Sequence, residues 1–123
     1  MKTFSIMFGA ALAAVALAAG AHGDAKPMHG GIVQVEADVL YELVPQAGGA
    51  AVYVVDHGKP VDTAGMSGKL TVLAGTQKTE AALKPAGGNK LEAANVAVGS
   101  GAKVVASIKR ADGKTASVRF VVK

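Results

Sequence analysis

Hydrophobic and polar residues alternate with a period of two along most of the chain after residue 31. The alternation is clearest in residues 115–122, TASVRFVV, where small or apolar side chains at even positions alternate with Thr, Ser and Arg. This pattern predicts a strand with one face buried. Residues 103–109 show the same pattern, and Asp112-Gly113 between the two segments is typical of a tight hairpin.

The same alternation predicts six further strands, each short and bounded by turn residues. They cover residues 32–36, 39–44, 51–56, 69–73, 79–83 and 90–93. No segment has the 3.6-residue period of an amphipathic helix. Two stretches, 81–84 and 91–94, are compatible with a helix, but Pro85 and the nearby glycines end them within about a turn. The pattern therefore predicts an all-β fold, a small antiparallel β-sandwich or Greek-key barrel of about seven to eight strands.

The first 21 residues follow a different pattern, that of an export signal. Lys2 precedes an apolar stretch at 4–18, and Ala19-Gly20-Ala21 forms an A-x-A cleavage site. The stretch is shorter than the roughly 20 residues that span a bilayer, so we expect no membrane span after processing. These features predict a bacterial periplasmic protein that consists of a signal peptide at 1–21, a flexible N-terminal arm at 22–31 and a β-sandwich domain at 32–123.

Composition excludes several classes of function. The chain has no cysteine, and its formal net charge of +4 is spread along its length. Disulfides and thiolate metal sites are therefore excluded, and scattered lysines with few aromatic residues indicate no nucleic-acid binding. The sequence also lacks the nucleophile-elbow, phosphate-loop, dinucleotide-binding and zinc-protease motifs, so we do not expect an enzyme.

Three histidines remain as candidates for chemistry, and all of them lie outside the predicted strands. His22 and His29 belong to the arm, and His57 lies in a turn. Imidazole and thioether ligands suit copper, so Met28 beside His29 adds a soft ligand to the three histidines. If cleavage leaves His22 at the N-terminus, its α-amine and imidazole can chelate Cu(II) together. The cofactor that we expect is a copper ion, Cu(II) or Cu(I), with zinc or silver as alternatives.

Each of these residues also has an ordinary structural explanation. A histidine in an arm is often only solvated, and the His57 ring can be held by Asp56 within its turn. Met28 and Met66 can fill apolar gaps, which is the usual role of methionine. Under this interpretation the protein is an interaction module that docks to another envelope protein through a sheet edge, with incidental histidines.

Several short segments resemble a known family. They are Met28-His29-Gly30-Gly31, Tyr41-Glu42-Leu43-Val44, residues 52–61 (VYVVDHGKPV), Leu83-Lys84-Pro85 and Val118-Arg119-Phe120. Over residues 29–123 the chain resembles the β-rich N-terminal periplasmic domain of adaptor subunits in heavy-metal efflux pumps of the resistance-nodulation-division type. The resemblance implies handling of copper, silver, zinc, cobalt or cadmium, with His29 as the first ligand. The chain lacks the helical hairpin, lipoyl-like domain and barrel domain of a full adaptor.

We therefore predict a periplasmic metal-binding protein that serves as an accessory or chaperone in heavy-metal resistance. Its partners would be the metal ion and a component of a metal efflux system or another envelope protein. We expect it to act as a monomer or a weak dimer.

Overall fold

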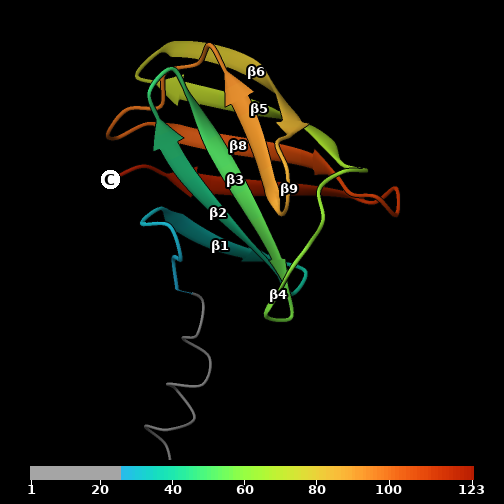
Figure 1. Cartoon of the computed structure of the whole chain (residues 1–123). Helices are drawn as coiled ribbons and strands as arrows, with labels where there is room; N and C mark the ends of the chain where they lie inside the picture. The colour runs from blue at the N-terminus through green and yellow to red at the C-terminus, as the bar shows by residue number, and fades with distance from the viewer. Residues whose placement is uncertain (1–25) are drawn as a thin grey trace, which may run out of the picture.

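The structure, a computed structural model, describes residues 26–123 and is built from β-strands there (Figure 1). The strands are β1 (Ile32–Glu36), β2 (Val39–Gln46), β3 (Gly49–Asp56), β4 (Lys59–Pro60), β5 (Ser67–Ala74), β6 (Gln77–Pro85), β7 (Lys90–Ala94), β8 (Lys103–Lys109) and β9 (Thr115–Val121). The predicted all-β fold is confirmed. The predicted signal peptide and His22 lie outside the described residues. Within residues 26–123 no helix is long and apolar enough to cross a membrane.

The strands form one antiparallel sheet that curls into a barrel. Their order is β1-β2-β3-β7-β6-β5-β8-β9, and the short β4 pairs with β3. β6 joins two halves of the barrel, because it pairs with β5 along most of its length and with β7 at Lys84 and Pro85. At the ends of the order, β1 and β9 pack against each other without being hydrogen-bonded neighbours. The barrel is therefore nearly closed, with a seam between β1 and β9.

The interior of the barrel is a single aliphatic core to which both halves contribute. The largest side chains in it are Tyr41 from β2 and Phe120 from β9, both almost completely buried. In β9, Val118 and Phe120 point inward while Arg119 is exposed, as the alternation predicts. Each large aliphatic side chain buried in this way stabilises the fold by about 1.5–3 kcal/mol relative to exposure. Met66 is also a core residue, which fits the gap-filling explanation for it.

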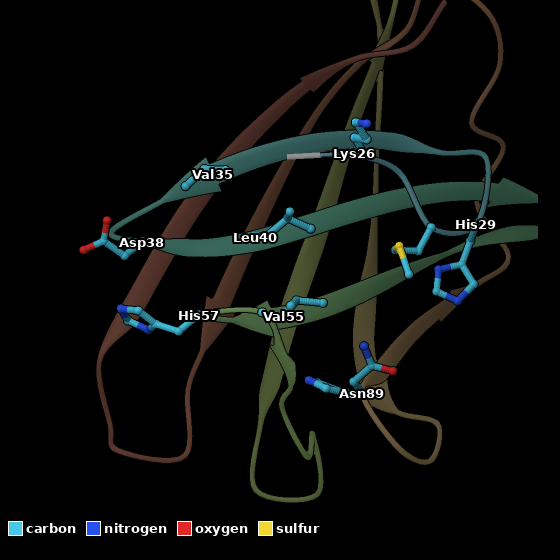
Figure 2. Close-up of a pocket in the computed structure, with 11 residues that line it drawn as sticks. Lys26, His29, Val35, Asp38, Leu40, Val55, His57 and Asn89 are labelled. Atoms are coloured by element: carbon cyan, nitrogen blue, oxygen red, sulfur yellow. The ribbon is translucent and has the colours of Figure 1, made fainter. Parts of the chain in front are cut away.

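Two tight turns lie at one end of the first half of the barrel. Ala37 and Asp38 connect β1 to β2 with φ values of 51° and 66°. His57 and Gly58 connect β3 to β4 with φ values of 52° and 80°. Positive φ at both central residues is the type I′ conformation that matches the twist of a two-stranded ribbon. The β3–β4 turn places His57 beyond the end of the sheet and on the same side as Asp38 (Figure 2).

Candidate functional site

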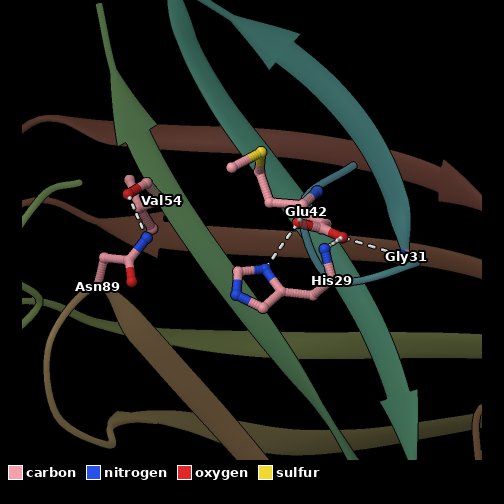
Figure 3. Close-up of polar contacts among 6 residues, drawn as sticks. His29, Gly31, Glu42, Val54 and Asn89 are labelled. Carbon is pink, nitrogen blue, oxygen red and sulfur yellow. Dashed lines mark hydrogen bonds and ion pairs between the residues drawn. The ribbon is translucent and has the colours of Figure 1, made fainter. Parts of the chain in front are cut away.

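The arm that precedes β1 is attached to the outer face of β2 by the side chain of Glu42. Glu42 points away from the core, yet only 1% of it is exposed, because residues 28–31 cover it. Its Oε1 accepts hydrogen bonds from the backbone N–H of Met28 at 3.0 Å and from the His29 ring at 3.0 Å. Its Oε2 accepts from the backbone N–H of His29 at 2.8 Å and of Gly31 at 2.9 Å (Figure 3). All four bonds converge on one carboxylate.

These bonds keep Glu42 ionised although it is buried. Burial alone acts to raise the pKa of the carboxyl group. The hydrogen bonds from the His29 side chain and from the backbone of Gly31, His29 and Met28 act in the opposite direction and prevail, so the pKa lies below its ordinary value. Hydrogen bonds to an ionised acceptor are about twice as strong as neutral ones. Glu42 is therefore a buried negative charge that is compensated by the arm.

Two glycines let the arm approach β2 so closely. Gly30 has a φ of 73°, a left-handed conformation that side chains disfavour. A Cβ atom on Gly31 would lie 2.3 Å from the carbonyl oxygen of Leu43, which is a backbone atom that cannot move aside. The Gly30-Gly31 pair is thus required by the geometry of the contact between the arm and β2.

His29 is oriented by two contacts on different sides of its ring. Its Nδ1 donates to Glu42, and its ring stacks on Tyr53 with centroids 3.6 Å apart and an interplanar angle of 6°. An ionised carboxylate can only accept, so Nδ1 carries the proton and Nε2 of the neutral ring keeps its lone pair. The side chain is 42% exposed. A carboxylate on the other ring nitrogen is the usual arrangement around histidines that bind metals.

His29 lies at one end of an open hollow of about 730 Å³ on the outer face of β1, β2 and β3 (Figure 2). The floor of the hollow is apolar and includes Leu40 and Val55. Met28 also lines it and is 76% exposed, so its thioether faces solvent. Asn89 lines it too. The Nδ2 atom of Asn89 donates to the carbonyl of Val54 at 3.2 Å, which leaves Oδ1 as its second polar atom.

His57 lines the same hollow from its other end. Its Nδ1 contacts the Asp56 carboxylate, and Asp56 also lies 3.7 Å from Arg110. The partner of Asp56 in β2 is Val39, three residues from Glu42 along the strand, or about 10 Å. Ligands of one ion are about 4 Å apart, so His29 and His57 cannot share an ion in this conformation. Within residues 26–123 no three His, Asp or Glu side chains are grouped to hold a metal.

The structure thus brings Met28 and His29 together, places His57 at the opposite end of the hollow and leaves His22 outside the described residues. It also reveals three residues that the sequence did not indicate, namely Glu42, Tyr53 and Asn89. Glu42 alternates with Tyr41 and Leu43 in a strand and so resembles a solvated residue of the outer face. Only the folded arm shows that it is buried.

Comparison of the chain with protein-family models, with curated proteins and with solved structures returned no match. The function of the site is therefore inferred from its own residues and from the sequence.

Proposed function

We propose that the protein binds a metal ion, copper above all, at the end of the hollow that His29 and Met28 line. We infer that it works in the bacterial periplasm as an accessory or chaperone in heavy-metal handling, as the sequence resemblance to efflux adaptor domains implies. One observation carries this proposal: Nδ1 of His29 contacts the buried Glu42 carboxylate, so that in the neutral ring the proton lies on Nδ1 and Nε2 is the nitrogen left to bind a metal.

The donor atoms near His29 fit a soft or borderline ion. Nε2 of a neutral imidazole suits copper and zinc, and the thioether of Met28 suits Cu(I) in particular. The amide oxygen of Asn89, which lines the same hollow, is a third candidate ligand. Because the hollow is open and Met28 is exposed, a bound ion would be accessible for transfer to a partner, as the role of a chaperone requires.

The predicted mature N-terminus would add further ligands. Lys26 lines the hollow, and His22 precedes it by four residues. A segment of that length spans at most about 14 Å, so the α-amine and imidazole of His22 would be within reach of the hollow.

A competitive titration tests the proposal. The protein is purified after export, its N-terminus is determined by intact mass, and it is titrated with Cu(I), Cu(II) and Zn(II) against a chelator. We expect one-to-one binding that His29→Ala weakens at least 100-fold and that Glu42→Gln weakens about 10- to 100-fold through the orientation of the ring. Met28→Leu should weaken Cu(I) binding more than Zn(II) binding.

His57→Ala is the matched control, because His57 lines the same hollow but lies too far from His29 to bind the same ion. We expect it to change the affinity less than twofold, a difference of about 0.4 kcal/mol. Unchanged stoichiometric binding in His29→Ala would show that the site is elsewhere. An absence of binding in the unmodified protein would rule out the metal function itself.

A further inference from the structure

A second feature of the surface lies on the other half of the barrel. Away from the pairing of β6 with β7, the outer face of β5, β6, β8 and β9 carries five exposed cationic side chains and a single acidic one, Glu80; we call this part the cationic face. Its cations are Lys69, Lys78, Lys103, Lys109 and Arg119. The net charge of these six residues is +4, which equals the formal net charge of the whole chain. The rest of the chain is therefore electrically balanced.

Most of this charge has no acidic partner in the described part of the chain. Glu80 is shared by Lys69 at 3.4 Å and Lys78 at 3.9 Å. Lys103, Lys109 and Arg119 make no ion pair within 4.0 Å among residues 26–123. Lys84, at the end of β6, is left out of this set because it lies opposite Glu92 in the pairing of β6 with β7.

Aliphatic side chains alternate with the cations at one end of this face. The registers of the four strands place Lys78, Leu73, Lys103 and Val121 next to one another in a row. Leu73 is 40% exposed and Val121 is 59% exposed, so apolar surface adjoins the cations in this row. The row borders a shallow hollow of about 360 Å³ that Arg119 also lines. Three cations thus surround an apolar depression.

We propose that the cationic face docks to the surface of a bilayer that contains anionic lipids. Phosphate groups of the lipids would contact Lys78, Lys103 and Arg119, while Leu73 and Val121 would reach the boundary of the acyl chains. Cations are attracted to anionic headgroups, and aliphatic side chains gain by entering the boundary of the acyl chains, so a face that carries both suits a membrane interface. A protein interface would instead bury a contiguous apolar centre with few charges.

This arrangement leaves the candidate metal site free. The outer face of β8 and β9 points away from β2 and β3, whose outer face carries the hollow with His29 (Figure 1). Docking through the cationic face would therefore hold the protein at a membrane with its hollow open to the aqueous side. The docking surface shares no residue with the site of the proposed function, so each can fail without the other.

Sedimentation with vesicles tests the proposal. The exported protein is mixed with vesicles of phosphatidylcholine, or of phosphatidylcholine and phosphatidylglycerol at about three to one. We expect binding to the anionic vesicles only, and weaker binding as salt is raised. Each cation near such a surface strengthens binding about fivefold, so Lys103→Gln with Arg119→Gln should weaken it about 25-fold.

The matched control is the pair Lys59→Gln and Lys90→Gln, which removes the same net charge from the half of the barrel that carries β3. It should change binding less than twofold, an effect of about 0.4 kcal/mol. Leu73→Ser with Val121→Ser should weaken binding without changing its dependence on salt. Thermal unfolding of every variant shows whether the fold is retained.

Several outcomes would overturn the proposal. If the Lys59/Lys90 variant loses as much vesicle binding as the Lys103/Arg119 variant, binding depends on net charge and not on the cationic face. Equal sedimentation with neutral vesicles would exclude recognition of anionic lipids. A protein that does not bind vesicles could still bind polyglutamate through Lys103 and Arg119, and that result would assign the face to an acidic protein. Binding of free glycerol 3-phosphate through the same two residues, again without vesicle binding, would assign it to a soluble phosphate compound.

Discussion

At the scale of single residues, Glu42 determines both the position of the arm and the state of His29. It accepts three backbone N–H groups and one ring N–H while nearly all of its surface is buried. A buried charge without such partners would cost several kcal/mol, so the arm and the carboxylate stabilise each other. The same contact fixes the orientation of the His29 ring and, in the neutral ring, leaves Nε2 as the nitrogen that can bind a metal, which links the stability of the arm to the chemistry of the hollow.

Glu42→Gln should therefore destabilise the protein and remove part of its sensitivity to acid. At neutral pH we expect a loss of about 3 kcal/mol in the free energy of unfolding, because charge-assisted hydrogen bonds are lost in a buried site. The pKa of Glu42 is lower in the folded protein than its ordinary value of 4.5. Its stabilising contribution is thus complete above that value and disappears as the pH falls through the lower, folded pKa.

Urea unfolding of both proteins at a series of pH values measures this contribution. The difference in the free energy of unfolding between the two proteins should be constant from neutral pH down to about pH 5, and it should decrease in stronger acid. Glu80→Gln is the control, because Glu80 is an exposed carboxylate in a surface ion pair, worth about 0–1 kcal/mol. If Glu42→Gln lowers the free energy of unfolding by the same amount at every pH, the lowered pKa of Glu42 is contradicted.

At the scale of elements, alternation predicted the eight longer strands, although most of them extend beyond the predicted ends. β1 and β8 have the predicted bounds, whereas β2 continues to Gln46 and β5 begins at Ser67. These extensions follow from pairing, since each added residue has a partner in the neighbouring strand. The sequence pattern does not predict β4, because a pairing of two residues has no period of its own and depends on β3.

The contact between the arm and β2 depends on Gly31, so we expect Gly31→Ala to detach or strain it. The new Cβ would approach the carbonyl oxygen of Leu43 to 2.3 Å, and overpacking of this kind costs about 1–3 kcal/mol. Gly99→Ala is the matched control, because a Cβ there meets no atom within 4 Å. Thermal unfolding of the two variants provides the comparison. Equal melting temperatures would show that the arm tolerates a side chain at residue 31.

At the scale of the whole molecule, strand order decides which distant residues share a surface. β7 lies between β3 and β6, although β4 and β5 separate β3 from β6 in the chain. This order brings Asn89, which precedes β7, to the hollow with His29. It also gathers five cations of β5, β6, β8 and β9 on one face, whereas along the sequence they are evenly scattered.

The seam between β1 and β9 should be the place where the barrel opens most readily. These strands pack together but are not hydrogen-bonded neighbours, whereas β3 and β5 have a paired strand on each side. Amide hydrogen exchange should therefore be slowest in β3 and β5, and fastest at those amides of β1 and β9 that point into the seam. Strong protection of these seam amides would show that hydrogen bonds close the barrel.

The sequence by itself determined the fold class, most strand positions and three of the residues at the hollow, Met28, His29 and His57. Period-two alternation and turn residues are local signals, so they can be recognised without knowing which strands pair with each other. His29 and Met28 could be singled out because an imidazole and a thioether outside the strands are rare in this chain. Glu42, Tyr53 and Asn89, which lie near His29 in the folded protein, could not be singled out in the same way.

Only the tertiary structure decided that Glu42 is buried and ionised, that His57 is distant from His29 and that the cations form one face. Glu42 occupies an outward position of its strand, and the folding of the arm over it changes its environment from water to protein. The distance between the histidines and the grouping of the lysines depend on strand order and register. Both are set by packing between residues far apart in the chain, which no local pattern records.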